Sequence, residues 1–271
     1  MLYLFLIILS ILSVSLAYHQ KSFLRMGTIA VFGGTGQTGR ECVYQALKEG
    51  KKVISLSRSG PPFLIPPGSG GDDVDKPMND PNLTVLQGSV TSASDVAKVF
   101  DTSDDIEGVI IALGGKTKDV GKTMLTDGTN LIVDEMHKNN VKRVSVVTSI
   151  GAGDSESQAP FFFKMLMKTV MSGIFVDKNN QESIFLNGKG SDLEYCIVRP
   201  GGLGVGAPTG VINVIDGEAG SIQRADVATF CLGAITDPNF EYIKKTPCIS
   251  SVGGTGWVKQ KGKDFDSVTK A

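Results

Sequence analysis

Histidine and cysteine are scarce in this chain, which limits the metal and disulfide sites that it can form. Its 271 residues include two histidines, His19 and His137, and four cysteines that lie far apart in the sequence. A zinc site requires clustered cysteine and histidine, and a disulfide framework requires paired cysteines. We therefore predict no metal site and expect four buried thiols. These are Cys42, Cys196, Cys231 and Cys248.

The chain also lacks an excess of either charge. It has 27 Lys and Arg against 28 Asp and Glu, and no block of basic residues. This balance does not favour a nucleic-acid partner and leaves a small-molecule ligand open, uncharged or anionic. With roughly 25 N-terminal residues set aside, roughly 245 remain, which is enough for one α/β domain.

No charged residue occurs between Leu2 and Ala17, and Ser15 and Ala17 are spaced as in a signal-peptidase site. Basic residues follow this run instead of preceding it. The alternatives for residues 1–25 are a cleaved signal peptide, an uncleaved membrane anchor, and translation that starts at Met26. The uncharged run is shorter than the roughly 17–25 residues of a spanning helix. We expect routing to an endomembrane system or a plastid, with membrane contact only through this segment.

From residue 28 onward, short β-branched runs alternate with segments of helical period. This alternation predicts a single α/β domain, a Rossmann-type doubly wound parallel sheet, over residues 27–252, with a tail at 253–271. The expected strands are 28–32, 52–57, 83–87, 108–113, 143–148, 193–198 and one near Cys248. The expected helices are 37–49, 93–100, 125–138, 160–176, 177–187 and 225–235.

One long segment, residues 58–82, interrupts the alternation. It contains six prolines, among them the pairs at 61–62 and 66–67, a Gly-Ser-Gly-Gly stretch and four aspartates. Such a composition does not form regular structure, so we expect a surface insertion.

The strongest motif is a glycine-rich turn placed between a predicted strand and a predicted helix. Glycines in such a turn let the backbone approach a pyrophosphate, whose charge is met by free N–H groups and the positive end of the helix dipole. The motif predicts a dinucleotide site at Gly33, Gly34, Thr35, Gly36, Gln37, Thr38 and Gly39.

The end of the second predicted strand distinguishes the two nicotinamide cofactors. A carboxylate there binds the ribose of NAD, whereas an arginine accommodates the 2′-phosphate of NADP. The residues are Ser57, Arg58 and Ser59, with no acid among them. Arg58 and the serines therefore favour NADP(H), and the alternative is that Arg58 is a solvated loop residue.

Five stretches together resemble the atypical short-chain dehydrogenases/reductases that include NmrA-like proteins and the biliverdin reductase B/flavin reductase family. They are IAVFGGTGQTG at 29–39, DGTNLI at 127–132, VKRV at 141–144 before Thr148 and Ser149, YCIVRPGGL at 195–203, and RADVA at 224–228. The resemblance implies cofactor contacts by Leu113, Gly114, Thr148, Pro200 and Gly201, and places Ser149 beside the nicotinamide. We interpret Arg199 as structural.

The sequence departs from the wider superfamily at its Tyr-x-x-x-Lys motif. The expected lysine is Lys178, but Ile174 stands where the tyrosine would be. The only literal match, Tyr44 to Lys48, lies behind the glycine turn and is interpreted as a chance match. Ser89 replaces an acid common near the adenine site. The predicted catalytic residues are therefore Ser149 and Lys178, in supporting roles.

The segment 161–171, FFFKMLMKTVM, is apolar nearly all round. A core helix is the favoured interpretation. The alternatives are a lid over a flat apolar substrate, or contact with a partner or a membrane.

These observations predict an NADP(H)-binding oxidoreductase that reduces a conjugated small molecule such as a flavin, a tetrapyrrole or a quinone. The alternative is a non-catalytic NADP(H)-binding redox sensor or assembly factor of the NmrA-like type. The absent tyrosine favours the alternative, whereas Ser149 and Lys178 favour the enzyme.

Overall fold

The computed structural model describes residues 27–115, 121–216, 219–251 and 263–264. The signal or anchor segment expected at 1–25 lies outside the described residues, as does most of the tail expected at 253–271. In the ranges that are described, no helix is both long and apolar enough to cross a membrane.

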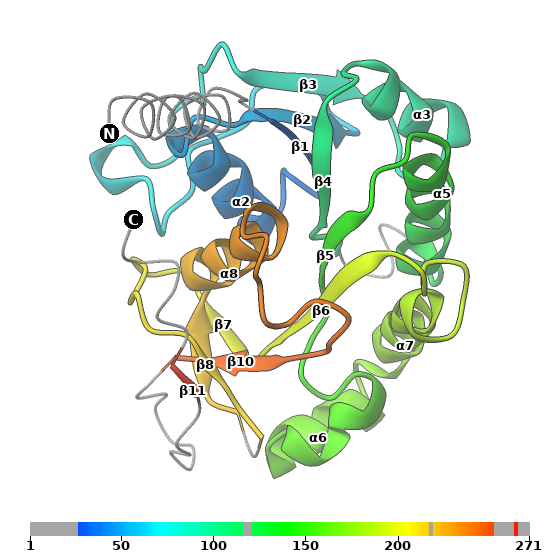
Figure 1. The fold of residues 1–271 in the computed structure, drawn as a ribbon. Coiled ribbons are helices and arrows are strands. Elements are labelled where there is room, and N and C mark those ends of the chain that lie inside the picture. The colour runs from blue at the N-terminus through cyan, green and yellow to red at the C-terminus, as the bar shows by residue number, and fades with distance from the viewer. Residues whose placement is uncertain (1–26, 116–120, 217–218, 252–262, 265–271) are drawn as a thin grey trace, which may run out of the picture.

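A nine-stranded sheet runs through the molecule in the order β11-β8-β10-β6-β5-β4-β1-β2-β3 (Figure 1). The chain leaves the β3 edge and returns to place β4 beside β1, which creates the switch point where doubly wound sheets bind ligands. Only β8 pairs antiparallel, with β10 and β11. The strands are β1 Thr28–Phe32, β2 Lys52–Ser57, β3 Leu83–Gln87, β4 Ile106–Ile111, β5 Arg143–Val147, β6 Glu194–Pro200, β8 Asn213–Val214, β10 Cys248–Ser250 and β11 Lys263–Asp264. A separate parallel pair comprises β7 Gly202–Gly204 and β9 Ser221–Gln223.

Helices cover both faces of the sheet (Figure 1). One face carries α2 Gln37–Lys48 and α8 Arg224–Thr236. The other carries α3 Ala93–Asp101, α5 Met124–Lys138 and α7 Ser172–Leu186. In β1, Ile29 and Val31 face one core while Ala30 and Phe32 face the other. Burial on both faces explains why the strand is a continuous apolar run instead of an alternating one.

The fold class is confirmed, and most elements begin and end within two residues of their predicted bounds. Strand β4 is displaced by two residues toward the N-terminus. The strands β7, β8, β9 and β11 were not predicted, because two or three residues carry too little periodicity to be recognised. All four cysteines are free and buried, as expected.

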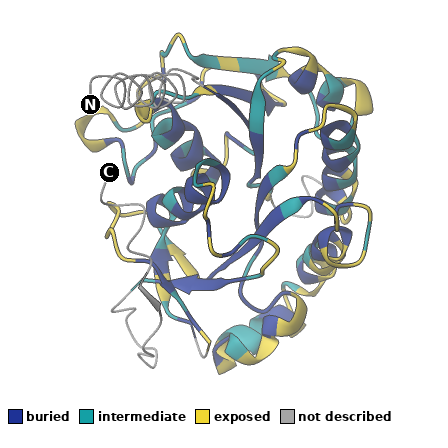
Figure 2. Ribbon diagram, in the orientation of Figure 1, coloured by how far each residue is buried: buried dark blue, intermediate teal, exposed yellow. Residues whose placement is uncertain are grey.

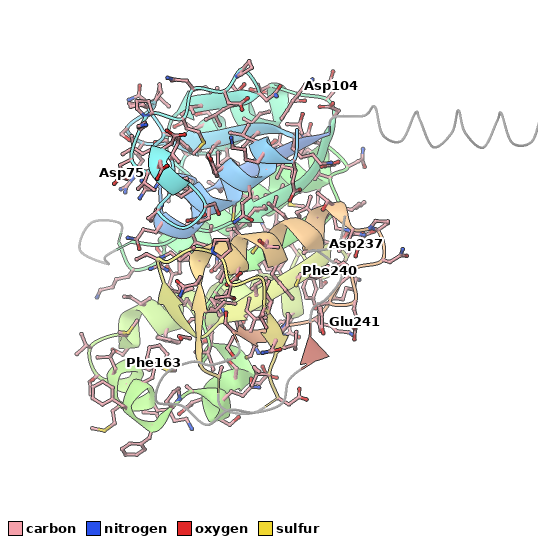
Figure 3. The ribbon with its side chains drawn as sticks, turned by 90° about the vertical axis from the view of Figure 1, so that its left-hand side faces the viewer. Asp75, Asp104, Phe163, Asp237, Phe240 and Glu241 are labelled. Carbon is pink, nitrogen blue, oxygen red and sulfur yellow. The ribbon has the colours of Figure 1, made fainter. Side chains whose placement is uncertain are left out.

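The apolar segment after β5 differs most from its prediction. Helix α6 Phe161–Lys168 ends where Thr169 leaves helical geometry, and α7 begins at Ser172 instead of continuing a helix to 176. The core-helix interpretation is wrong for the outer face of α6, because Phe161 and Phe162 are each 78% exposed. Figure 2 shows this mixture of exposed and buried residues, and Figure 3 shows Phe163 on α6 at the end of the molecule away from Asp104. Phe163 packs edge-on against Phe175, with ring centres 6.0 Å apart.

The segment 58–82 is irregular, as predicted, apart from the short 3₁₀ helix η1 Gly71–Asp73. It is nevertheless tied to the domain. Phe63 and Met78 are buried in the same core as α2 and α8. The backbone N–H of Gly68 donates to Glu41 Oε1 of α2 over 2.8 Å, so the insertion packs on the outer side of α2.

Candidate functional site

A cavity of about 570 Å³ opens at the carboxyl ends of β1, β2, β4 and β5. This is the switch point of the sheet, and the volume is typical of a small-molecule site. Eleven of the sixteen predicted site residues line it: Gly33, Thr35, Gly36, Gln37, Thr38, Ser57, Arg58, Leu113, Gly114, Thr148 and Lys178. The sequence thus identified residues from five separate segments that the fold brings together.

The glycine turn owes its shape to close backbone packing. Gly33 has φ +87°, and a side chain there would overlap the carbonyl of Ala112. A side chain on Gly39 would overlap the carbonyl of Gly33. Gly39 and Gly34 therefore shape the turn from behind, which explains why neither lines the cavity.

The start of α2 faces the cavity with its backbone donors available. Gly36 precedes the helix and supplies no side-chain cap, and the first turn contains no acid. Gln37 and Thr38 line the cavity at this helix end. An uncapped helix N-terminus presents N–H groups and a partial positive charge, which is what a pyrophosphate needs. The residues present therefore fit a dinucleotide.

Two arginines stand at this end of the cavity. Arg58 is exposed at the end of β2, and none of the ion pairs among the described residues uses its guanidinium. The hydroxyl of the buried Ser57 lies 3.2 Å from that of Ser59. Arg224, at the start of α8, donates from Nε to Gln37 Oε1 over 2.9 Å, and burial lowers its pKa. The stretch that begins at Arg224 is part of the family resemblance, but its sequence alone assigns Arg224 no role.

The other end of the cavity is organised by a network of buried charges. The Arg199 guanidinium, 2% exposed, donates from Nη2 to Glu182 Oε2 over 2.6 Å and from Nε to Glu182 Oε1 over 3.1 Å. Arg199 Nη1 also donates to Asp154 Oδ1. The Thr148 hydroxyl donates to Glu182 Oε1 over 2.7 Å. Arg199 therefore holds Glu182, and Glu182 in turn orients Thr148 at the cavity wall.

Lys178 lies one helical turn before Glu182 on α7. Its ammonium donates to the Thr148 backbone carbonyl over 3.1 Å. Burial lowers the pKa of Lys178 to about 8, against the opposing effect of the Glu182 and Asp177 charges. A lysine with this pKa carries its proton weakly enough to change charge near neutral pH.

Besides Gly34 and Gly39, three predicted residues lie outside the cavity lining. The Ser149 hydroxyl donates to the Ile150 carbonyl over 3.0 Å. Pro200 ends β6, and the N–H of Gly201 donates to the Ile249 carbonyl. Their roles in binding or catalysis remain predictions. Tyr44 packs against the core on α2 and is also absent from the lining, which agrees with its interpretation as a chance match.

The guanidinium of Arg199 is engaged by two carboxylates, a geometry that is compatible with its interpretation as a structural residue. Burial opposes its charge, but the hydrogen bonds and charges of Glu182 and Asp154 raise its pKa. The Arg199 hydrogen bond correspondingly lowers the pKa of Asp154. Across the part of the chain that the structure describes, no group of three or more His, Cys, Asp or Glu is arranged to hold a metal.

Relatives of known sequence share most of this domain. An uncharacterized chloroplastic protein of Arabidopsis thaliana is 31% identical over 224 residues, which cover 76% of this chain and 71% of that protein. A UPF0659 protein of Saccharomyces cerevisiae is 26% identical over 234 residues, which cover 83% of this chain and 93% of the yeast protein.

Solved structures share the fold. ChuY, an anaerobillin reductase from Escherichia coli O157:H7, is 24% identical, covers 86% of this chain and all of its own, and superposes with a TM-score of 0.63. A wide-type short-chain dehydrogenase/reductase from Veillonella parvula in complex with NADP is 12% identical, covers 84% of this chain and 96% of its own, and has a TM-score of 0.62. The model of a family described as NAD(P)H-binding matches residues 33–238. With the glycine turn, the switch-point cavity and this match, the chain belongs to the NAD(P)H-binding family.

Proposed function

We propose that this protein is an NADPH-dependent reductase of a conjugated small molecule. The observation that carries the proposal is Lys178, which lines the cofactor cavity and whose ammonium donates to the carbonyl of Thr148, directly after β5. Hydride transfer requires a site that orients the nicotinamide and balances the charge that develops on the acceptor. Thr148 and Lys178 supply such groups on rigid elements.

The preference for NADPH over NADH rests on Arg58. The end of β2 has no carboxylate that would bind an unmodified ribose or repel a phosphate. Arg58 lines the cavity there with its guanidinium free of the described ion pairs, and Ser57 and Ser59 offer hydroxyl donors. An arginine in this setting suits a 2′-phosphate.

Bound NADPH supplies the hydride, and the protein supplies orientation and electrostatics. Lys178 binds the nicotinamide ribose or neutralises negative charge on the acceptor. Ile174 stands where the superfamily has its tyrosine, so the chain presents no tyrosine acid at this point. An extended conjugated acceptor spreads the new charge over atoms that solvent can protonate, so a flavin, quinone or tetrapyrrole suits the site better than a simple ketone.

The second candidate is an NADP(H)-binding redox sensor or assembly factor without turnover, and the isoleucine at position 174 favours it. Under either function we propose a plastid location. The Arabidopsis relative is named as a chloroplastic protein, which supports this location over an endomembrane one.

The decisive experiment is NADPH oxidation by the purified protein with a flavin, a quinone or a linear tetrapyrrole as the acceptor. A reductase turns over at least one of them and loses activity in Lys178→Met. The sensor function predicts tight NADPH binding by calorimetry with no turnover of any acceptor. Failure of the protein to bind either nicotinamide cofactor would overturn both functions.

A further inference from the structure

A second, smaller recess adjoins the cofactor cavity. Its volume is about 240 Å³, and it lies between Gly114, Gly115 and the first turns of α5 and α7. The recess and the cavity share four lining residues, Gly114, Gly115, Met124 and Lys178. A molecule in the recess therefore lies next to the cofactor site, with Lys178 at the boundary.

The walls of the recess are mostly apolar. Met124, Leu125, Met171 and Ile174 line it, from α5, the α6–α7 turn and α7. Gly173 adds a wall without a side chain, and a Cβ built there meets no atom within 4 Å. Such walls favour a flat apolar body, and the volume lies just below the roughly 300–1,000 Å³ of drug-sized sites.

The described lining of the recess carries two lysines and one acid. The only acid in the described lining is Asp177, and its carboxylate is already occupied. Asp177 Oδ2 accepts from the Leu125 N–H over 2.9 Å, and Oδ1 accepts from the Thr126 N–H and hydroxyl over 3.0 and 2.6 Å. This carboxylate caps the start of α5 from α7, and both of its oxygens accept hydrogen bonds in doing so.

Neither lysine of the recess donates to a carboxylate of a described residue, although the charges of Glu182 and Asp177 act on Lys178. Among the described residues, Lys178 donates to the Thr148 carbonyl alone, and Lys122, which is exposed at the rim, has no hydrogen bond or ion pair. Over the residues that the structure describes, the lining therefore combines an apolar body with two lysines and one acid, Asp177, whose two oxygens are already hydrogen-bonded. An anionic group on a ligand could form charge-assisted hydrogen bonds with both lysine ammonium groups.

We propose that this recess binds the acceptor, and that the acceptor is a small flat apolar molecule with a carboxylate or similar anionic group. Its apolar body lies against Met124 and Ile174, and its anionic group lies between Lys122 and Lys178. The identity of the ligand as the acceptor rests on the proposed reductase function; the existence of the binding site does not.

Binding of a matched pair of probes tests the site. We would titrate 2-naphthoate and its uncharged amide into the protein, with and without saturating NADP⁺, by calorimetry. Naphthoate is expected to bind about tenfold more tightly than the amide. A charge-assisted hydrogen bond is stronger than a neutral one, and the difference corresponds to a roughly tenfold change in the dissociation constant. Equal affinities of the two probes would overturn the proposal.

Two pairs of variants place the probe in the recess. Lys122→Glu should abolish the preference for naphthoate, whereas Lys52→Glu, the same charge change at the amino end of β2, should leave it intact. Ile174→Asp should weaken both probes, whereas Val176→Asp, two residues along α7 and 60% exposed, should weaken neither. The proposal is wrong if either recess variant behaves like its control.

The assignment as the acceptor site has a separate readout. Naphthoate should inhibit NADPH oxidation competitively against 1,4-naphthoquinone-2-sulfonate and not against NADPH. Binding without competition would leave a ligand site but overturn its role in the reaction. Loss of NADP⁺ binding would instead refute the proposed function, and the titration without NADP⁺ would still decide on the recess.

Discussion

The two ends of the cofactor cavity are built in different ways. At one end, a single stretch from Gly33 to Gly39 forms the site from its own backbone, and side chains matter there mainly by their absence. At the other end, Thr148 and Lys178 depend on a buried network from β6 and α7 that is centred on Glu182. An added side chain should therefore disrupt the first end, whereas loss of a hydrogen-bonding partner should disrupt the second.

The largest expected effect comes from breaking the buried network. Arg199→Met leaves Glu182, 1% exposed, as an unpaired buried carboxylate, which should lower the free energy of unfolding by about 3–5 kcal/mol. Urea unfolding measures this loss. The control is Arg143→Met, whose partner Glu194 is half exposed, and it should cost much less. A loss below about 1 kcal/mol in Arg199→Met would show that the network does not support this end of the site.

The backbone-built end should fail when a side chain is added. Gly39→Val forces atoms into the Gly33 carbonyl, so we expect destabilisation of about 1–3 kcal/mol together with loss of NADPH binding by calorimetry. Gly173→Ala, in α7 with open space around its Cβ, should leave both properties unchanged. Retained NADPH affinity in Gly39→Val would mean that the turn does not form the cofactor site.

Cofactor choice should depend on one side chain at the rim. Arg58→Ala removes a charge-assisted phosphate contact of about 1.5–3 kcal/mol, so the preference for NADPH over NADH should fall roughly tenfold or more. Dissociation constants for both cofactors measure it. Lys52→Ala, at the opposite end of the same strand, is the control. Equal dissociation constants for NADPH and NADH in the unmodified protein would contradict the proposed role of Arg58.

The network end should also depend on pH. Lys178 has a pKa of about 8 in the folded protein, below the ordinary lysine value of 10.5. Between these values the unfolded chain binds the extra proton, so the free energy of unfolding gains a contribution that rises as pH rises from about 8 toward 10.5. This rise should be smaller in Lys178→Met, measured by unfolding across the range. Parallel curves for the two proteins would contradict the lowered pKa.

The smallest effect is expected at the literal Tyr-x-x-x-Lys match. Tyr44 packs on α2 with the Lys48 ammonium 5.1 Å from its ring centre, and it does not line the cavity. Tyr44→Phe should therefore leave NADPH affinity and turnover unchanged. A loss of turnover with the fold and cofactor binding intact would move the active site away from the Thr148 end.

The same contrast separates what was predictable from what was not. The glycine turn, Arg58 and the strand ends that flank the cavity were predicted, because each follows from a short stretch with its own local signal. Arg224 and Glu182 were missed as parts of the site. Their roles depend on partners 187 and 17 residues away, Gln37 and Arg199, and no local pattern marks such a contact.

The sequence by itself determined the doubly wound sheet, the dinucleotide turn and the buried thiols, because hydrophobic period and backbone freedom are local properties. Tertiary structure alone decided that Asp177 caps α5 beside the lysines of the recess, and that the apolar segment breaks at Thr169 and exposes Phe161 and Phe162. Those outcomes depend on which elements pack together. Packing depends on interactions between segments that are far apart in the sequence, and no local sequence pattern shows which of these segments will be in contact.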